Sequence, residues 1–381
     1  MSEVRFKLET HPPRILAQAG AGTMELPALW LRERCQDPAS LDPDTQQRLF
    51  DPHRLPEDLA LVQVTAAGEN RVRLSFSDGY SGEYELTRLV EEFARGDGLP
   101  AQIPWRSDLK LQALSIDGRR LESDAVRLLA VRTFLTYGFI IIQNLATDPE
   151  RILEVARRFG FVRETNFGRY FEVYSRPGSN DLAYRPVPLG AHTDNPYREP
   201  VPGVQLLHCL VNETSGGWST LVDSLAVAAT LEEEDPQGLE LLASIPVQFR
   251  FIDAQEELIE RRPIVQRDAT GRMTGVHYSP RLDYLPLLDA ATLRRFQRAR
   301  RRLSELFADP RFELRFPLKP GELMMFDNSR VLHGRTAYDP NEGRRHLQGC
   351  YIDLDGPRSL FRTLSRRLEA RVASDAQAVA S

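Results

Sequence analysis

The feature that most constrains this chain is a His-x-Asp triplet, His192 to Asp194, followed far downstream by His333. Residues i and i+2 of a strand point to the same side, so His192 and Asp194 can reach one metal ion while Thr193 faces away. His333 has to arrive from a distant strand, so such a site would close only in the folded protein. Two histidines and one carboxylate suit one face of an octahedral Fe(II), with the opposite face open for a co-substrate and oxygen.

The triplet alone is a weak signal, because H-x-D often arises by chance and His192 could be an ordinary surface or core histidine. Arg345, which follows His333 by 12 residues, strengthens the metal interpretation. An arginine fork binds a carboxylate through two parallel hydrogen bonds, and an iron site that chelates a 2-oxo acid needs such an anchor for the far end of the acid. A surface salt bridge is the alternative role for Arg345.

The length of 381 residues is more than one compact domain usually holds, which predicts two domains. We expect a small β-rich domain over residues 1–98, where alternating strands flank turns at 67–70 and 77–80. Residues 99–381 would form the second domain and carry the metal site. Their many short strands, with a Pro-Gly turn before the strand that leads to His333, predict an α+β, mainly β fold. We expect a jelly-roll barrel with flanking helices.

Three local patterns in the second domain are clear enough to give boundaries. Residues 123–137 have the spacing of an amphipathic helix, and residues 138–144 have the composition of a buried strand. Asp148 and Pro149 predict the start of a further helix, with the aspartate as the cap and the proline at the first position.

Charge and hydropathy argue against several classes of partner. The chain has 49 Lys and Arg against 54 Asp and Glu, so its formal net charge of −5 gives no global attraction to nucleic acid or acidic membranes. A cluster of arginines at 294–302 lies on a predicted amphipathic helix and is interpreted as a solvated face. No stretch approaches the roughly 20 apolar residues that span a bilayer, and the first residues show no secretory signal. We therefore expect a cytoplasmic protein without nucleic-acid or membrane partners.

Several ordered motifs resemble the γ-butyrobetaine dioxygenase group of the taurine dioxygenase superfamily. An early stretch at residues 26–35 is similar to the N-terminal domain of that group, and the resemblance covers nearly the whole chain. The motifs that carry it in the second domain are residues 183–184, 191–194, 202–209, 216–217, 326–328, 332–335 and 345–347.

The resemblance implies a double-stranded β-helix and an enzyme that uses Fe(II), 2-oxoglutarate and O2 to hydroxylate its substrate. It implies that His192, Asp194 and His333 bind the iron. It assigns the distal carboxylate of 2-oxoglutarate to Arg345. By the same resemblance, Ser219 supplies an assisting hydroxyl and Leu207 lines the co-substrate pocket.

The resemblance also implies an aromatic cage, which binds a trimethylammonium group through cation–π attraction. Phe167, Phe171, Tyr184 and Tyr351 match its positions. The family is richer in Tyr and Trp there, so two phenylalanines make this cage electronically weaker. Core packing is the alternative role for Phe167 and Phe171.

Departures from the family pattern bear on zinc and on the substrate's acidic end. The family's N-terminal domain usually has a cysteine cluster and a histidine for structural zinc, whereas Cys35 stands alone here, so we expect no zinc. Asp181, Asn195 and the run at 278–281 differ from the family at positions that help hold a carboxylate. A phosphonate, as in 2-(trimethylammonio)ethylphosphonate, is therefore a candidate, with charge supplied by Arg176, Arg185 or Arg281.

These observations predict an iron- and 2-oxoglutarate-dependent dioxygenase that hydroxylates the carbon chain of a small trimethylammonium zwitterion. One alternative is a taurine- or sulfonate-type oxygenase that ignores the ammonium group. A second is a non-catalytic binding module on the same barrel, against which the intact metal and arginine motifs argue. The resemblance further suggests a homodimer.

Overall fold

Two facing β-sheets form the centre of the larger of the two units into which the chain divides. The computed structural model describes residues 4–19, 22–89, 98–174 and 187–380, and the units are Met1–Gly98 and Leu99–Ser381. Four residues with expected roles at the substrate site lie outside the described residues: Arg176, Asp181, Tyr184 and Arg185.

The smaller unit contains two three-stranded antiparallel sheets. One joins β1 (Val4–Thr10), β2 (Pro13–Ala19) and β3 (Gly22–Glu25), and the other joins β4 (Leu61–Ala66), β5 (Arg71–Phe76) and β6 (Ser81–Glu85). Alternate residues of β5 are buried, so one face of the strand contributes to the core. The short helix α1 (Ala28–Glu33) packs into the same core through Leu31.

Cys35 is buried in this core as a free thiol beside the guanidinium group of Arg32. The central carbon of that guanidinium lies 3.8 Å from the ring centroid of Tyr80 and 4.5 Å from that of Phe50. The Nε of Arg32 donates a hydrogen bond to Asp78 over 2.9 Å. Cys35 therefore packs against a cation that is held between aromatic rings and paired with a carboxylate.

The larger unit contains a seven-stranded and a four-stranded sheet. The large sheet has the order β10-β22-β12-β20-β8-β7, and β9 also pairs with β22. Its strands are β7 (Ser115–Asp117), β8 (Phe139–Gln143), β9 (Val162–Arg163), β10 (Phe171–Tyr174), β12 (Val204–Asn212), β20 (Leu323–Asp327) and β22 (Arg345–Ile352). The small sheet has the order β11-β21-β13-β19, with strands β11 (Leu189–His192), β13 (Ser219–Asp223), β19 (Glu313–Phe316) and β21 (Val331–Arg335).

Apolar side chains from both sheets meet in one buried cluster, which shows that the sheets face each other. Leu207 and Phe326 come from the large sheet, and Leu221 and Val331 come from the small sheet. The predicted mainly β fold, with a jelly-roll core and flanking helices, is confirmed. Among the described strands no pairing joins one sheet to the other, so the two sheets face each other without closing into one continuous barrel.

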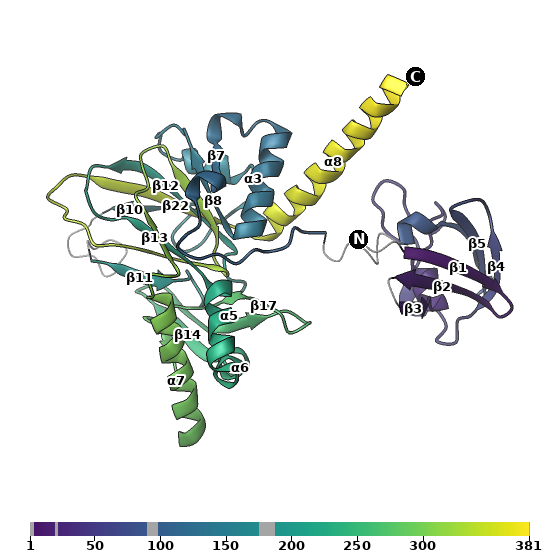
Figure 1. The fold of residues 1–381 in the computed structure, drawn as a ribbon, viewed down its shortest axis with the longest axis horizontal. Coiled ribbons are helices and arrows are strands. Elements are labelled where there is room, and N and C mark those ends of the chain that lie inside the picture. The colour runs from purple at the N-terminus through teal and green to yellow at the C-terminus, as the bar shows by residue number, and fades with distance from the viewer. Residues whose placement is uncertain (1–3, 20–21, 90–97, 175–186, 381) are drawn as a thin grey trace. The chain divides into compact units, whose positions relative to one another are not determined.

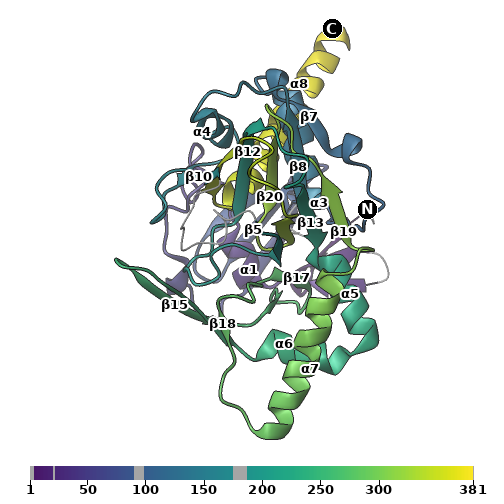
Figure 2. The same ribbon diagram turned by 90° about the vertical axis from the view of Figure 1, so that its left-hand side faces the viewer.

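Helices cover the outer faces of the two sheets (Figures 1 and 2). The large sheet packs against α3 (Asp124–Tyr137), α4 (Arg151–Ala156) and the start of α8 (Asp355–Ala380), which continues past the sheets in Figure 1. The small sheet packs against α5 (Ser224–Glu234), α6 (Pro236–Ser244) and α7 (Ala290–Phe307). Short strands complete this side: β14 (Val247–Ile252), β15 (Glu257–Arg262), β16 (Val265–Arg267), β17 (Met273–Val276) and β18 (Asp283–Tyr284).

The bounds of α3 and β8 agree with the sequence patterns, whereas the start of α4 does not. Helix α3 begins directly after Ser123 and ends at Gly138, whose φ of 80° suits glycine, and β8 follows at once, as predicted. The predicted start of α4 is wrong. That helix begins after Glu150, which has a φ of 64° and donates its backbone N–H to Oε1 of Gln348 over 2.8 Å. A side chain from β22 thus binds this N–H and replaces the predicted local cap.

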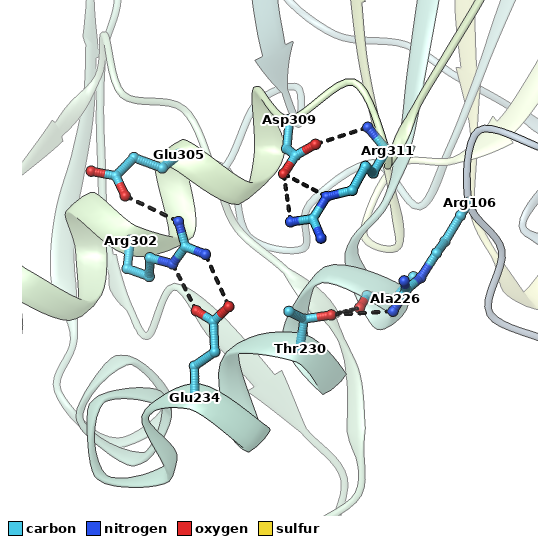
Figure 3. Close-up of polar contacts among 8 residues, drawn as sticks. All are labelled: Arg106, Ala226, Thr230, Glu234, Arg302, Glu305, Asp309 and Arg311. Carbon is cyan, nitrogen blue, oxygen red and sulfur yellow. Dashed lines mark hydrogen bonds and ion pairs between the residues drawn. The ribbon is translucent and has the colours of Figure 1, made fainter.

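Ion pairs join α5 to α7 at the surface (Figure 3). The Nε and Nη2 of Arg302 donate to the two carboxylate oxygens of Glu234 over 2.7 and 2.9 Å, and its Nη1 donates to Glu305 over 3.2 Å. These groups are open to solvent, so the pairs contribute little to stability. Arg294 and Arg298 of α7 are exposed as well, in agreement with the predicted solvated face.

Candidate metal and co-substrate site

Three potential metal ligands converge where β11 pairs with β21. His192 ends β11, and it is the direct antiparallel partner of His333 on β21. Asp194 follows in the loop, with Oδ1 at 3.4 Å from Nε2 of His192 and at 3.9 Å from Nε2 of His333. One ligand atom from each of the three residues lies within 4.8 Å of the others. Thr193 turns away, because its Oγ1 accepts a hydrogen bond from the backbone of Tyr278 over 2.9 Å.

A backbone carbonyl fixes the tautomer of His192, and the side chain of Asn328 holds the turn at Asp194. The Nδ1 of His192 lies 2.9 Å from the carbonyl oxygen of Gly190, which can only accept, so Nδ1 carries the proton and Nε2 is free to bind a metal. The buried side chain of Asn328 accepts from the N–H of Asp194 over 2.7 Å and donates to its carbonyl over 2.9 Å. Asn195 follows with a φ of 55°, a left-handed conformation that asparagine tolerates well.

The electrostatics of Asp194 and His333 suit a divalent cation. Burial raises the pKa of Asp194, but the neighbouring His333 and His192 and the hydroxyl of Tyr351 outweigh it and hold the pKa well below its usual value. Burial, with a contribution from His192, lowers the pKa of His333 to about 3. An ionised carboxylate and a neutral imidazole are the protonation states that metal binding requires, so Asp194 and His333 fit Fe(II).

A buried ion pair supports the turn that carries Asn328 and leads to His333. Arg330 is fully buried, and its Nε and Nη2 donate to the two carboxylate oxygens of Asp223 over 3.1 and 3.0 Å. The same guanidinium donates to the carbonyl oxygens of Thr136 and Ile103. The turn between β20 and β21 is thereby tied to the end of β13.

A cavity of about 90 Å³ extends from the triad between the sheets and contains Arg345 in its wall. This guanidinium is buried, and its Nη2 donates to the carbonyl oxygen of Gly217 over 3.1 Å. Its Nε has no hydrogen-bond partner among the described residues. Gly217 has a φ of 65°, and a Cβ there would lie 2.7 Å from that Nε, so glycine is required. Arg345 is thus not a surface salt bridge, and a buried arginine without a carboxylate partner among the described residues is suited to bind an anion.

Ser219 and Leu207 line the same cavity. Arg335 and Gln205 line it as well, although the sequence analysis gave neither a role. Arg335 is the direct partner of Ser219 across β13 and β21. It lies two residues beyond His333 on one strand, and that spacing is a signal from which its orientation could have been predicted.

A second cavity of about 510 Å³ adjoins the first at His192 and Asp194, and aromatic rings form much of its wall. Phe167, Phe171 and Tyr351 are among them, with Tyr197, Phe251 and Tyr284 in addition. The rings form a chain of contacts, with centroid separations of 5.4 Å for Tyr351–Phe171, 6.3 Å for Phe171–Phe167, 6.1 Å for Phe167–Phe251 and 5.0 Å for Phe251–Tyr197.

Tyr351 connects this aromatic wall to the metal triad. Its hydroxyl donates a hydrogen bond to Oδ2 of Asp194 over 2.7 Å. Phe171 packs beside it above Gly349, where a Cβ would lie 2.3 Å from the phenylalanine ring. The absence of a side chain at position 349 therefore lets the ring approach the sheet closely.

Polar side chains also line the larger cavity. Arg281 and the buried Ser279 line it, and Arg281 makes no ion pair or hydrogen bond with any described residue. Arg250 also lines it, but its Nε donates to Glu257 over 2.8 Å. Of these two described arginines, Arg281 is therefore the one with its charge available to a ligand.

Comparisons with known proteins agree with this geometry. Residues 105–351 match the taurine catabolism dioxygenase TauD, TfdA family, and residues 18–90 match the gamma-butyrobetaine hydroxylase-like N-terminal family. The chain is 34% identical to a gamma-butyrobetaine dioxygenase of Pseudomonas sp. (strain AK-1), over 89% of this chain and 90% of that protein.

Two further relatives act on trimethylammonium compounds according to their names. A trimethyllysine dioxygenase of Meyerozyma guilliermondii is 27% identical over 88% of this chain and 89% of its own length. A gamma-butyrobetaine dioxygenase of Pongo abelii is 28% identical over 90% of this chain and 92% of its own length. Among the described residues, no helix has both the length and the apolar character needed to cross a membrane.

Proposed function

This chain belongs to the taurine catabolism dioxygenase TauD, TfdA family, and we propose that it hydroxylates the carbon chain of a small trimethylammonium zwitterion. It is an Fe(II)- and 2-oxoglutarate-dependent dioxygenase. When bound, the iron and 2-oxoglutarate supply an O2-dependent oxidation that converts C–H to C–OH and releases succinate and CO2.

In this proposal, His192, Asp194 and His333 hold the iron. The fixed tautomer of His192 and the ionised Asp194 preorganise these ligands before the metal arrives. Arg345 and Ser219 hold the distal carboxylate of 2-oxoglutarate, and Leu207 lines its apolar side. The buried walls around them exclude water from the reacting centre.

The observation that carries the substrate class is the aromatic wall that begins at Tyr351, one hydrogen bond from the metal triad. A trimethylammonium group has no N–H to donate, so aromatic faces are the groups that recognise it. Phe167, Phe171 and Tyr351 would contribute to that recognition, and Phe251 and Tyr197 continue the same wall. The resemblance adds Tyr184 and Asp181 to the proposed substrate site.

Arg281 and Ser279, which line the same cavity, would hold the anionic end. A guanidinium binds a carboxylate or a phosphonate equally well in geometric terms. A γ-butyrobetaine-like carboxylate and 2-(trimethylammonio)ethylphosphonate therefore both remain candidates, and Arg176 and Arg185 are further proposed sources of charge.

The experiment is succinate release from anaerobically iron-loaded protein after addition of 2-oxoglutarate and air. γ-Butyrobetaine, 2-(trimethylammonio)ethylphosphonate, trimethyllysine and taurine are compared, with His333→Ala as the metal-site control. We expect one trimethylammonium compound to give equal amounts of succinate and hydroxylated product. Coupled turnover with taurine alone would establish the sulfonate-type alternative. Failure to bind iron and 2-oxoglutarate would establish the non-catalytic alternative.

Two organisational expectations belong to the same proposal. We propose a homodimer, which sedimentation equilibrium tests directly, and a cytoplasmic address without nucleic-acid or membrane partners. A monomer over the micromolar range would contradict the dimer and leave the proposed reaction unaffected.

A further inference from the structure

A buried polar side chain in the wall of the smaller cavity has an oxygen without a partner. Gln205 of β12 is 2% exposed, and neither its Oε1 nor its donor Nε2 makes a hydrogen bond with a described residue. An unpaired buried amide is unfavourable. Leu207 and Met324 line the same cavity, so hydrocarbon side chains are accommodated in this wall. The presence of an amide among them indicates a ligand that it binds.

The strand register places Gln205 at the metal end of the cavity. It is the direct antiparallel partner of both Phe326 on β20 and Tyr351 on β22, so the three side chains form a row on one face of the sheet. The ring centroid of Phe326 lies 4.8 Å from that of His333, and the hydroxyl of Tyr351 donates to Asp194. Each neighbour of Gln205 in the row thus contacts a metal ligand.

Arg345 lies towards the other end of the same face. Residues 345, 347, 349 and 351 of β22 point to the same face, so Arg345 and Tyr351 share the inner face of the sheet. Arg345 is the first residue of the strand and Tyr351 is its last residue but one. The cavity therefore has Arg345 towards one end and a neutral amide at the other, with Arg335 as a second arginine in its wall. That asymmetry suits a dicarboxylate whose second carboxylate is neutralised by a metal and needs only a neutral donor there.

We propose that the carboxamide of Gln205 donates an N–H hydrogen bond to the metal-binding carboxylate of 2-oxoglutarate and so fixes the orientation of the co-substrate. The inference rests on the proposed function for the ligand set, His192, Asp194 and His333. A carboxamide has two N–H donors and can rotate to present them to an anion. Gln205 then acts at the opposite end of the co-substrate from Arg345.

The test is an anaerobic titration of 2-oxoglutarate into Fe(II)-loaded protein, followed by the visible charge-transfer band. In Gln205→Leu we expect weaker binding by roughly tenfold or more, as for a lost hydrogen bond to a charged group. We also expect the band to shift, because the electron density on the chelating carboxylate changes. Gln205→Glu, which keeps the size of the side chain, should weaken binding further by placing a carboxylate beside an anion.

The matched control is Gln348→Leu, a second buried glutamine on the same sheet. Gln348 points to the opposite face, where its Nε2 donates to Glu172 over 2.9 Å. This variant should keep the band position and the 2-oxoglutarate affinity of the unmodified protein while losing thermal stability. A Gln205→Leu or Gln205→Glu protein that binds iron with an unshifted band and unchanged affinity would overturn the proposal.

The outcome is independent of the substrate class. The titration contains no hydroxylation substrate, so an error in the trimethylammonium assignment leaves it unaffected. Conversely, an unimportant Gln205 would leave the succinate-release comparison unchanged. Because the band reports the co-substrate complex directly, a purely structural role for Gln205 would lower stability without moving the band.

Discussion

The hydroxyl of Tyr351 donates to Oδ2 of Asp194 over 2.7 Å, while its ring centroid lies 5.4 Å from that of Phe171. One side chain therefore belongs both to the support of a metal ligand and to the aromatic wall. This relationship places the proposed ammonium site beside the iron. It also allows the two roles of one residue to be separated by mutation.

Tyr351→Phe removes the hydroxyl and keeps the ring. Loss of a hydrogen bond to a ligand carboxylate should weaken Fe(II) binding by roughly 10- to 100-fold. Preference for a trimethylammonium substrate over its dimethylamine analogue should persist, because the aromatic face is still present. Fe(II) titration and a substrate comparison measure the two effects. Unchanged iron affinity would show that the hydrogen bond does not support the metal site.

Replacement of His192 or Asp194 by alanine should abolish iron-dependent turnover, because each change leaves two of the three proposed ligands. Circular dichroism should remain that of the unmodified protein. Iron content after anaerobic loading and desalting provides the measurement. Near-normal turnover in either variant would refute the ligand assignment.

Arg345→Ala should raise the KM for 2-oxoglutarate by roughly 10- to 100-fold, as expected for the loss of charge-assisted hydrogen bonds. The KM for the hydroxylation substrate should change far less, because Arg345 does not line the larger cavity. Arg345→Lys serves as the comparison and should recover part of the affinity, since it restores the charge without the fork. An equal rise in both constants would point to a general structural effect.

Phe167→Leu tests the aromatic wall against simple hydrophobic packing. Loss of a cation–π contact should weaken binding of the trimethylammonium substrate by roughly two- to fivefold. A neutral isostere with a tert-butyl group in place of trimethylammonium should lose less affinity as an inhibitor. Inhibition constants and KM values in both proteins give the comparison. Equal losses for the two compounds would mean that Phe167 provides packing alone.

His208→Leu should reduce the loss in the free energy of unfolding that occurs as the pH falls from 7 to 5. Burial, with the nearby Arg151, lowers the pKa of His208 to about 4, from the ordinary value of 6.5. Its contribution to stability is therefore complete above pH 6.5 and is lost as the pH falls from 6.5 towards 4, where the unfolded chain binds the proton first.

The measurement for this prediction is the denaturant midpoint of both proteins at pH 7 and pH 5. The leucine variant should lose less stability between the two values than the unmodified protein. His53→Leu, which replaces an exposed histidine, provides the control. An identical loss in the His208 variant would show that this histidine does not contribute to acid sensitivity.

Local patterns in the sequence predicted parts of the fold well. Helix α3 lies between Ser123 and Gly138, and its end could be predicted because Gly138 adopts the positive φ that glycine favours. The start of α4 was not predictable in this way, because Gln348 binds the N–H of Glu150 from a strand far away in the sequence. The order of the strands in the two sheets likewise depends on pairings between distant residues that no local pattern specifies.

Some residues of the candidate site could likewise be predicted from local sequence, and others depend on contacts between distant strands. The His-x-Asp spacing and the downstream histidine identify the three side chains that the structure brings together. Phe251 and Tyr197 could not be assigned to the aromatic wall, because nothing in their own surroundings in the sequence distinguishes them from core residues. The role proposed for Gln205 depends on its row with Phe326 and Tyr351, which exists only across three paired strands.

The pairing of His192 with His333 has a consequence for local opening. Among the described strands, β11 ends the four-stranded sheet and has β21 as its neighbour. A metal ion bound to both histidines would link β11 to β21 in addition to their backbone hydrogen bonds, and β11 has no described strand on its other edge. Backbone amides of β11 should then exchange with deuterium faster in the chelator-treated protein than in the iron-loaded protein. The ion would thus hold this edge strand to the sheet.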